Sequence, residues 1–189
     1  MIDQTDHCLV HTLLEHPAEF GSREHGRGLS RGMAGSGRTL LQSLDFWAKE
    51  QPEKRVFSFE DTSTSLTYAE LHASSTSLAE HLRSKLGLHQ GDTCLLVYPP
   101  SLDFIVAFLA CVRAGVIAVP AFPPDPRRLK KDLYLFAAMQ SSCGAKIVLT
   151  SQEYNYAKKV SDIKGMFSLS SGPAWPELKW VITDALLRV

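Results

Sequence analysis

The residues most suggestive of chemistry are a tyrosine and two prolines, Tyr98, Pro99 and Pro100, that directly follow an apolar run. The continuous apolarity from Cys94 to Val97 predicts a strand that is covered on both faces of a sheet. In open α/β sheets, ligands bind just beyond the carboxyl ends of parallel strands. We therefore expect these three residues to lie at the edge of a ligand cleft, although a turn before a helix explains them equally well.

A second candidate is the glycine-rich stretch 32–39, which reads Gly-Met-Ala-Gly-Ser-Gly-Arg-Thr and is close to a phosphate-binding loop. Such a loop needs a buried strand before it and a lysine on the terminal phosphates. Arg38 stands at the lysine position, and residues 27–31 have no strand pattern. We interpret the stretch as a linker.

The candidate metal ligands are three histidines and a cysteine near the amino terminus: His7, Cys8, His11 and His16. Because no second cluster has zinc-site spacing, a solvated or partner-binding segment is favoured over a metal site. The remaining cysteines, Cys94, Cys111 and Cys143, are widely and irregularly spaced, which is typical of buried free thiols in a reducing compartment. With no apolar core of a secretory signal at the start, we expect a cytoplasmic protein. The cluster of Arg23, Arg27, Arg31 and Arg38 leaves an organelle-targeting segment as the alternative, against which the early acidic residues argue.

The elements that would position these residues alternate between helices and strands. Expected helices begin at Thr39, Thr67, Leu102, Leu129 and Ser151, and expected strands cover residues 56–59, 94–98, 116–119, 146–150 and 179–183. Strands that alternate with helices of ten or more residues predict right-handed crossovers. We therefore expect an α/β fold with a doubly wound, largely parallel sheet and flanking helices, and a long surface loop over residues 164–176.

Local signals fix several element ends. The sequence from Thr67 to Glu70 is a capping box, in which threonine and glutamate satisfy backbone amides at a helix start. Gly115 permits the left-handed backbone that ends a helix, and Pro120 ends the following strand because it cannot donate to the ladder. Residues 1–38 are rich in glycine and arginine toward their end, and we expect a flexible extension there.

Size and charge exclude some classes of function. The chain has 189 residues, with 20 basic and 20 acidic side chains, so its net charge gives no reason to expect nucleic acid as a partner. No stretch reaches the roughly eighteen uninterrupted apolar residues that a membrane span needs.

Several motifs, taken in order, resemble the adenylate-forming (acyl-activating) enzymes. Leu-Thr-Tyr-x-Glu-Leu at 66–71 is similar to an early signature of that family, and the helix–glycine–strand–proline run at 109–120 is similar to a second one. Pro-Ala-Phe-Pro-Pro-Asp-Pro at 120–126 resembles the fatty acyl-AMP ligase branch. The resemblance covers roughly residues 40–189 and implies that 39–189 are part of the amino-terminal α/β subdomain of such a ligase. It also implies that the cleft expected beside Tyr98, Pro99 and Pro100 would take an acyl chain or a nucleotide.

The resemblance implies a reaction in which ATP and Mg²⁺ activate a fatty acid as an acyl-adenylate, which is then passed to an acyl carrier protein or CoA. The basic run of Arg127, Arg128, Lys130 and Lys131 could meet a carrier protein or its phosphopantetheine, but such runs are more often a solvated face. The family's phosphate loop, nucleotide-binding segments and catalytic lysine do not occur in this sequence. We therefore assign no catalytic, cofactor-binding or metal residue.

Two further interpretations stay open. We expect the chain to be inactive without the remainder of a ligase domain, which makes that remainder its first partner. The alternatives are a non-catalytic binding or regulatory module of the kind found in the disco-interacting proteins, and a gene-model fragment.

Overall fold

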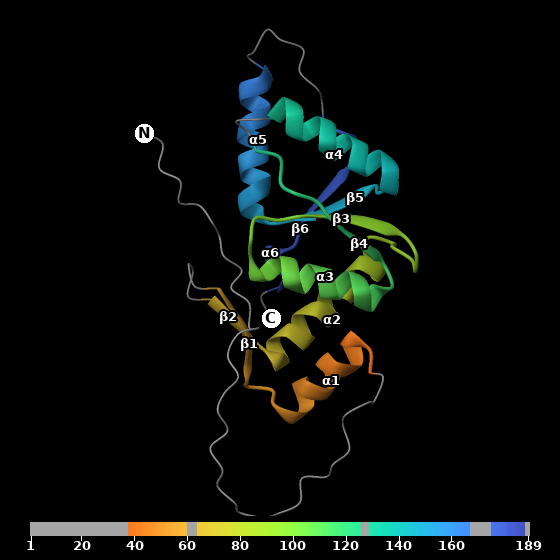
Figure 1. The fold of residues 1–189 in the computed structure, drawn as a ribbon, viewed down its shortest axis with the longest axis vertical. Coiled ribbons are helices and arrows are strands. Elements are labelled where there is room, and N and C mark those ends of the chain that lie inside the picture. Colours follow the sequence, from red (N-terminus) through yellow and green to blue (C-terminus); the bar gives the residue numbers. More distant parts are fainter. Residues whose placement is uncertain (1–37, 60–63, 126–128, 167–174, 188–189) are drawn as a thin grey trace, which may run out of the picture. The chain divides into compact units, whose positions relative to one another are not determined.

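A computed structural model of the chain describes residues 38–59, 64–125, 129–166 and 175–187 (Figure 1). The candidate metal ligands and Arg127 and Arg128 lie outside these residues, as does the glycine-rich stretch before Arg38. The predicted extension over residues 1–38 therefore stays a prediction. Within the described part of the chain, none of the helices has the length and apolarity required to cross a membrane.

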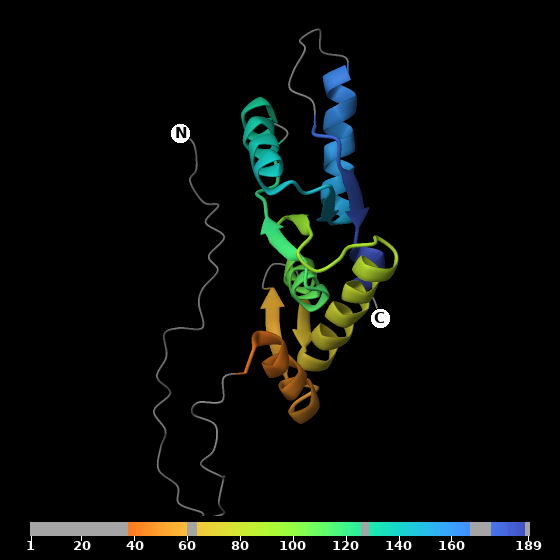
Figure 2. The same cartoon turned by 90° about the vertical axis from the view of Figure 1, so that its right-hand side faces the viewer.

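The centre of the fold is a parallel sheet of four strands in the order β4-β3-β5-β6. The strands are β3 (Thr93–Val97), β4 (Ile117–Pro120), β5 (Ile147–Thr150) and β6 (Lys179–Ile182). Helices cover both faces, as predicted: α4 and α5 lie on one side of the sheet, and α2 and α3 lie on the other (Figures 1 and 2). The expected α/β fold with a parallel sheet is confirmed.

The six helices described are α1 (Leu40–Glu50), α2 (Tyr68–Ser84), α3 (Leu102–Ala114), α4 (Leu129–Cys143), α5 (Gln152–Met166) and α6 (Asp184–Leu187). The predicted loop over residues 164–176 is wrong at its start, because α5 continues to Met166. Gly165 does not end that helix; a single interior glycine costs only about 1 kcal/mol. Residues 167–174 lie outside the described part.

One strand differs from its sequence interpretation. The apolar run after Gly115 predicts a buried strand, yet β4 is an edge strand whose first and last residues are exposed. Its register pairs Ile117 to Pro120 with β3 on one side only, so half of its backbone groups have no strand partner in the described residues. Apolarity alone did not distinguish an edge strand from the central strands β3 and β5, which are buried almost throughout.

A short antiparallel hairpin stands apart from the main sheet. It consists of β1 (Arg55–Phe59), which the sequence predicts, and β2 (Thr64–Thr67), which it does not. Only four residues form β2, and the capping box that follows dominates the local pattern. The hairpin packs with α1, α2 and α3 around a small cluster that contains Leu44, Leu71, Val106 and Leu109.

Capping explains where three helices begin and one ends. The side chains of Thr39 and Thr67 each accept a hydrogen bond from the third helical amide, and the side chains of Gln42 and Glu70 each accept one from the threonine amide. Thr39, the last residue of the stretch that is close to a phosphate-binding loop, thus caps α1. Ser151 accepts from the amide of Tyr154 at the start of α5. Gly115 ends α3 with a φ of 74°, as predicted.

Two apolar clusters fill the two sides of the sheet. The cluster against α2 and α3 includes Leu78, Leu82, Leu96, Ala110 and Cys111. The cluster against α4 and α5 is more aromatic, with Phe136, Tyr154, Trp175 and Trp180 in mutual ring contact. Apolar side chains therefore pack against both faces of the sheet.

Candidate ligand pocket at the carboxyl edge of the sheet

A pocket of about 400 Å³ lies beyond the carboxyl ends of three strands. Pro99, Pro100 and Ser101 reach it after β3, Ser151 after β5, and Asp184 after β6. The opposite wall comes from the hairpin, α2 and the first turns of α3 and α5, with the residues Phe59, Thr64, Ser65, Leu66, Ser74, Leu102, Asp103, Val106 and Glu153. This is the place where open parallel sheets bind ligands.

The three residues singled out in the sequence lie in two different positions. Pro99 and Pro100 line the pocket, and Pro100 is exposed. Tyr98 does not line it: the ring is only 5% exposed and packs into the core beneath the pocket, against Phe104. The assignment of these residues to the edge of an acyl or nucleotide cleft remains a prediction.

Buried hydroxyl groups connect the ends of β3, β5 and β6. The Tyr98 hydroxyl shares a hydrogen bond of 2.8 Å with Thr183 Oγ1, and Thr150 Oγ1 donates to the carbonyl of Val97 at 2.7 Å. Thr183 also donates through its amide to the Thr150 carbonyl, at 3.1 Å. Burial raises the pKa of the Tyr98 phenol far above its usual range, so this group is a neutral hydrogen-bonding partner and never a base at physiological pH.

The ionisable side chains that line the pocket are all acidic. Its lining contains three carboxylates and five hydroxyl groups, and none of these described residues is a lysine, arginine or histidine. Two buried oxygens of the lining, Ser101 Oγ and Asp184 Oδ1, have no hydrogen-bond partner, whereas Asp184 Oδ2 accepts from the amide of Gln152. An acidic pocket of this kind repels phosphate groups.

The ATP and Mg²⁺ that the resemblance implies would need cationic side chains for the triphosphate and a group of ligands for the metal. The lining offers no cation for the triphosphate, so the residues present do not fit it. Among the described residues, no group of three or more histidine, cysteine, aspartate or glutamate side chains could hold a metal ion. Phosphate and magnesium would have to be bound by groups other than these.

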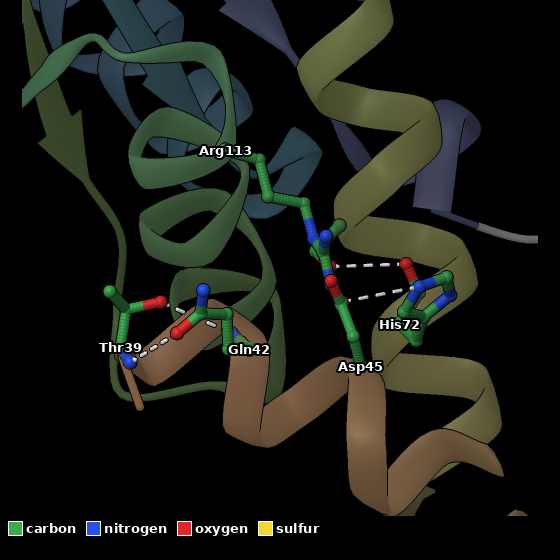
Figure 3. A network of polar contacts seen from close by, with 6 residues as sticks. Thr39, Gln42, Asp45, His72 and Arg113 are labelled. Carbon is green, nitrogen blue, oxygen red and sulfur yellow. Dashed lines mark hydrogen bonds and ion pairs between the residues drawn. The ribbon is translucent and has the colours of Figure 1, made fainter. Parts of the chain in front are cut away.

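A polar network that the sequence did not reveal joins three helices (Figure 3). Arg113 Nη2 of α3 donates to Asp45 Oδ1 of α1 at 2.6 Å, and Arg113 Nε donates to Ser75 Oγ of α2 at 3.0 Å. His72 Nε2 lies 3.3 Å from the same oxygen of Asp45. The partners are up to 68 positions apart, so no local pattern identifies them.

An apolar groove of about 360 Å³ lies beside this network, between α1, β1, α2 and α3. Its described lining includes Trp47, Phe57, Tyr68, Ile105 and Phe108 and carries no charged side chain. The partial exposure of Trp47 and Phe57 appears only in the structure.

Two of the three cysteines in the described residues are buried thiols, as expected. Cys94 and Cys111 are fully buried and free, and Cys143 is free and partly buried. The hydrogen bond with Cys111, together with burial, raises the pKa of the Cys94 thiol far above its usual range. The Cys94 thiol is therefore not a reactive nucleophile.

Comparison with known proteins identifies a family. A family model described as "AMP-binding enzyme" matches residues 44–183. The medium-chain-fatty-acid–acyl-carrier-protein ligase JamA of Moorena producens is 31% identical over 154 residues, which cover 78% of this chain and 24% of that protein. Disco-interacting protein 2 homolog B of Homo sapiens is 35% identical over 133 residues, which cover 64% of this chain and 8% of that protein.

Solved structures agree with the sequence comparisons. The fatty acid AMP ligase of Legionella pneumophila superposes with a TM-score of 0.59 and 25% identity, covering 77% of this chain and 23% of that one. The chain thus spans about a quarter of the length of the ligases that it matches.

Proposed function

The chain belongs to the AMP-binding enzyme family, close to the fatty acyl-AMP ligases, and we propose that it forms the amino-terminal α/β part of an enzyme that adenylates fatty acids. The observation that carries this proposal is the match to the family over residues 44–183. The parallel sheet, with a pocket at its carboxyl edge, supports it.

In this proposal the 189 residues supply the scaffold of the enzyme and not its phosphate-binding groups. In the complete reaction, ATP supplies the adenylyl group, and Mg²⁺ neutralises phosphate charge. The described pocket repels phosphate, so the groups that bind it come from elsewhere in the enzyme. We therefore propose that the 189 residues by themselves do not adenylate a fatty acid.

The names of the relatives support a proposal for the acyl acceptor. The name of JamA specifies an acyl carrier protein, which supports a carrier protein as the acyl acceptor. The alternative acceptor is CoA, which the sister branch of the family uses. We place the protein in the cytoplasm, because its fully buried free thiols, Cys94 and Cys111, are typical of a reducing compartment.

The test is fatty-acid-dependent exchange of labelled pyrophosphate into ATP. The transcript is first sequenced beyond the codon for Val189, and the polypeptide that it encodes is compared with the 189-residue chain. We expect exchange with medium- or long-chain fatty acids in the longer polypeptide and none in the chain alone. A longer polypeptide that binds ATP but shows no exchange with any fatty acid would contradict the proposal.

A second candidate is a non-catalytic binding module. The similarity to disco-interacting protein 2 homolog B and the absence of a cation in the described pocket favour it. Isothermal titration of ATP into the longer polypeptide separates the two functions, since a module of this type binds a partner or lipid without binding ATP. A transcript that stops at Val189 would favour the module or a gene-model fragment over the ligase.

A further inference from the structure

We propose that Tyr98 and Thr183 are positioning residues, which hold the carboxyl ends of β3 and β6 in register and so fix the walls of the pocket. The proposal rests on the proposed function, because the pocket is taken as the place where part of the substrate binds. It gives Tyr98 a role different from the cleft-edge role that the sequence suggests.

The first support is the position of the network. Tyr98 follows the last residue of β3, Thr150 is the last residue of β5, and Thr183 follows the last residue of β6. The next residues along the chain, Pro99 and Ser151 among them, belong to the pocket lining. The three hydroxyl-bearing residues thus directly precede, along the chain, the lining residues that follow β3, β5 and β6.

The second support is that β3 and β6 are not neighbours. Strand β5 lies between them, so no ladder hydrogen bond joins them directly. The 2.8 Å bond between Tyr98 and Thr183 crosses β5 and is a direct polar connection between the two outer walls. Residues 85 positions apart are joined in this way.

The third support is burial. Thr150 and Thr183 are fully buried, and Tyr98 nearly so. A hydroxyl in such surroundings loses its bonds to water, so removing the Thr183 hydroxyl takes away the Tyr98 hydroxyl's partner in this network. Removing the Tyr98 hydroxyl leaves Thr183 Oγ1 with only a long bond of 3.4 Å to the Thr150 carbonyl. The network therefore favours one arrangement of the three strand ends over looser ones.

The chain offers a matched control. Tyr154 is buried to a similar degree, and its hydroxyl donates to the carbonyl of Pro124 at 3.1 Å, within the cluster against α4 and α5. Its ring does not line the pocket. Tyr154→Phe thus removes a comparable buried hydrogen bond without touching the network.

The first experiment measures amide hydrogen exchange in the 189-residue chain, without any ligand. Tyr98→Phe should speed exchange about five- to tenfold in residues 183–186, as expected for the loss of one buried hydrogen bond. Thr183→Val should do the same in residues 101–104, and Thr183→Ser, which keeps the hydroxyl, should restore the original rates. Tyr154→Phe should leave both segments unchanged.

The second experiment measures kinetics in the longer polypeptide, with dodecanoate as the varied substrate. Tyr98→Phe should raise KM about five- to tenfold and leave kcat within about twofold, because the network positions binding groups and does not touch reacting atoms. Tyr154→Phe should change neither constant.

The outcomes separate the two proposals. If Tyr98→Phe speeds amide exchange in residues 183–186 but the longer polypeptide shows no adenylation activity, the proposed function is overturned and the positioning role stands. Active enzyme in which Tyr98→Phe and Tyr154→Phe behave alike, both in exchange and in KM, would overturn the positioning role.

Discussion

Arg113 connects three helices through two side chains that lie far from it in the sequence. Its guanidinium is largely buried and donates to Asp45 on α1 and to Ser75 on α2. Exposed ion pairs contribute little, but a buried guanidinium that loses its partner is costly. Arg113 is therefore the member of this network whose loss matters most.

We expect Arg113→Met to lower the free energy of unfolding by about 1–3 kcal/mol, because Asp45 and Ser75 lose a charged donor while the packing volume is kept. Asp45→Asn should cost less, since its carboxylate is more exposed. Urea denaturation of both variants and of the double variant measures the coupling between them. Additive effects of the two substitutions would show that the pair is not coupled.

At the scale of elements, helix ends are where sequence and structure agree best. The capping boxes at Thr39 and Thr67 use residues only three positions apart, so their geometry is independent of the rest of the fold. Strand β4 shows the opposite case. Its apolar residues suit a central strand, yet its place at the sheet edge depends on where the crossovers take the chain.

We expect Thr67→Ala to destabilise the chain by about 1 kcal/mol, because the amide of Glu70 loses its side-chain acceptor. The matched control is Thr76→Ala, an exposed position in the middle of the same helix, where alanine should be neutral or slightly stabilising. Thermal melts followed by circular dichroism measure both. Equal melting temperatures for the two variants would contradict a capping role for Thr67.

At the scale of the molecule, several large apolar side chains of the described residues are exposed. Tyr134, Leu135 and Met139 are exposed on α4, and Ile117 is exposed on the edge strand β4. Exposed apolar side chains and open sheet edges favour association. In the ligases that it matches, the chain corresponds to only about a quarter of the protein.

We expect the isolated 189-residue chain to associate at micromolar concentration, since these side chains gain by leaving water. Tyr134→Glu together with Leu135→Lys should shift the distribution toward monomer in sedimentation velocity runs. Exchanging two exposed residues that are already polar, Glu80→Lys and Arg83→Glu on α2, should leave it unchanged. A concentration-independent monomer with a sharp melt would contradict the expectation.

The sequence alone determined the order of the helices and strands other than β2 and α6, the helix starts at Thr67 and Ser151, the turn at Gly115 and the family. These features rest on side-chain periodicity and on hydrogen bonds between near neighbours, which a linear pattern records. Only the tertiary structure decided that β4 is an edge, that Tyr98 turns inward to Thr183, and that Arg113 meets Asp45. These contacts join residues that the crossovers bring together, and no local spacing encodes which strand or helix becomes a neighbour.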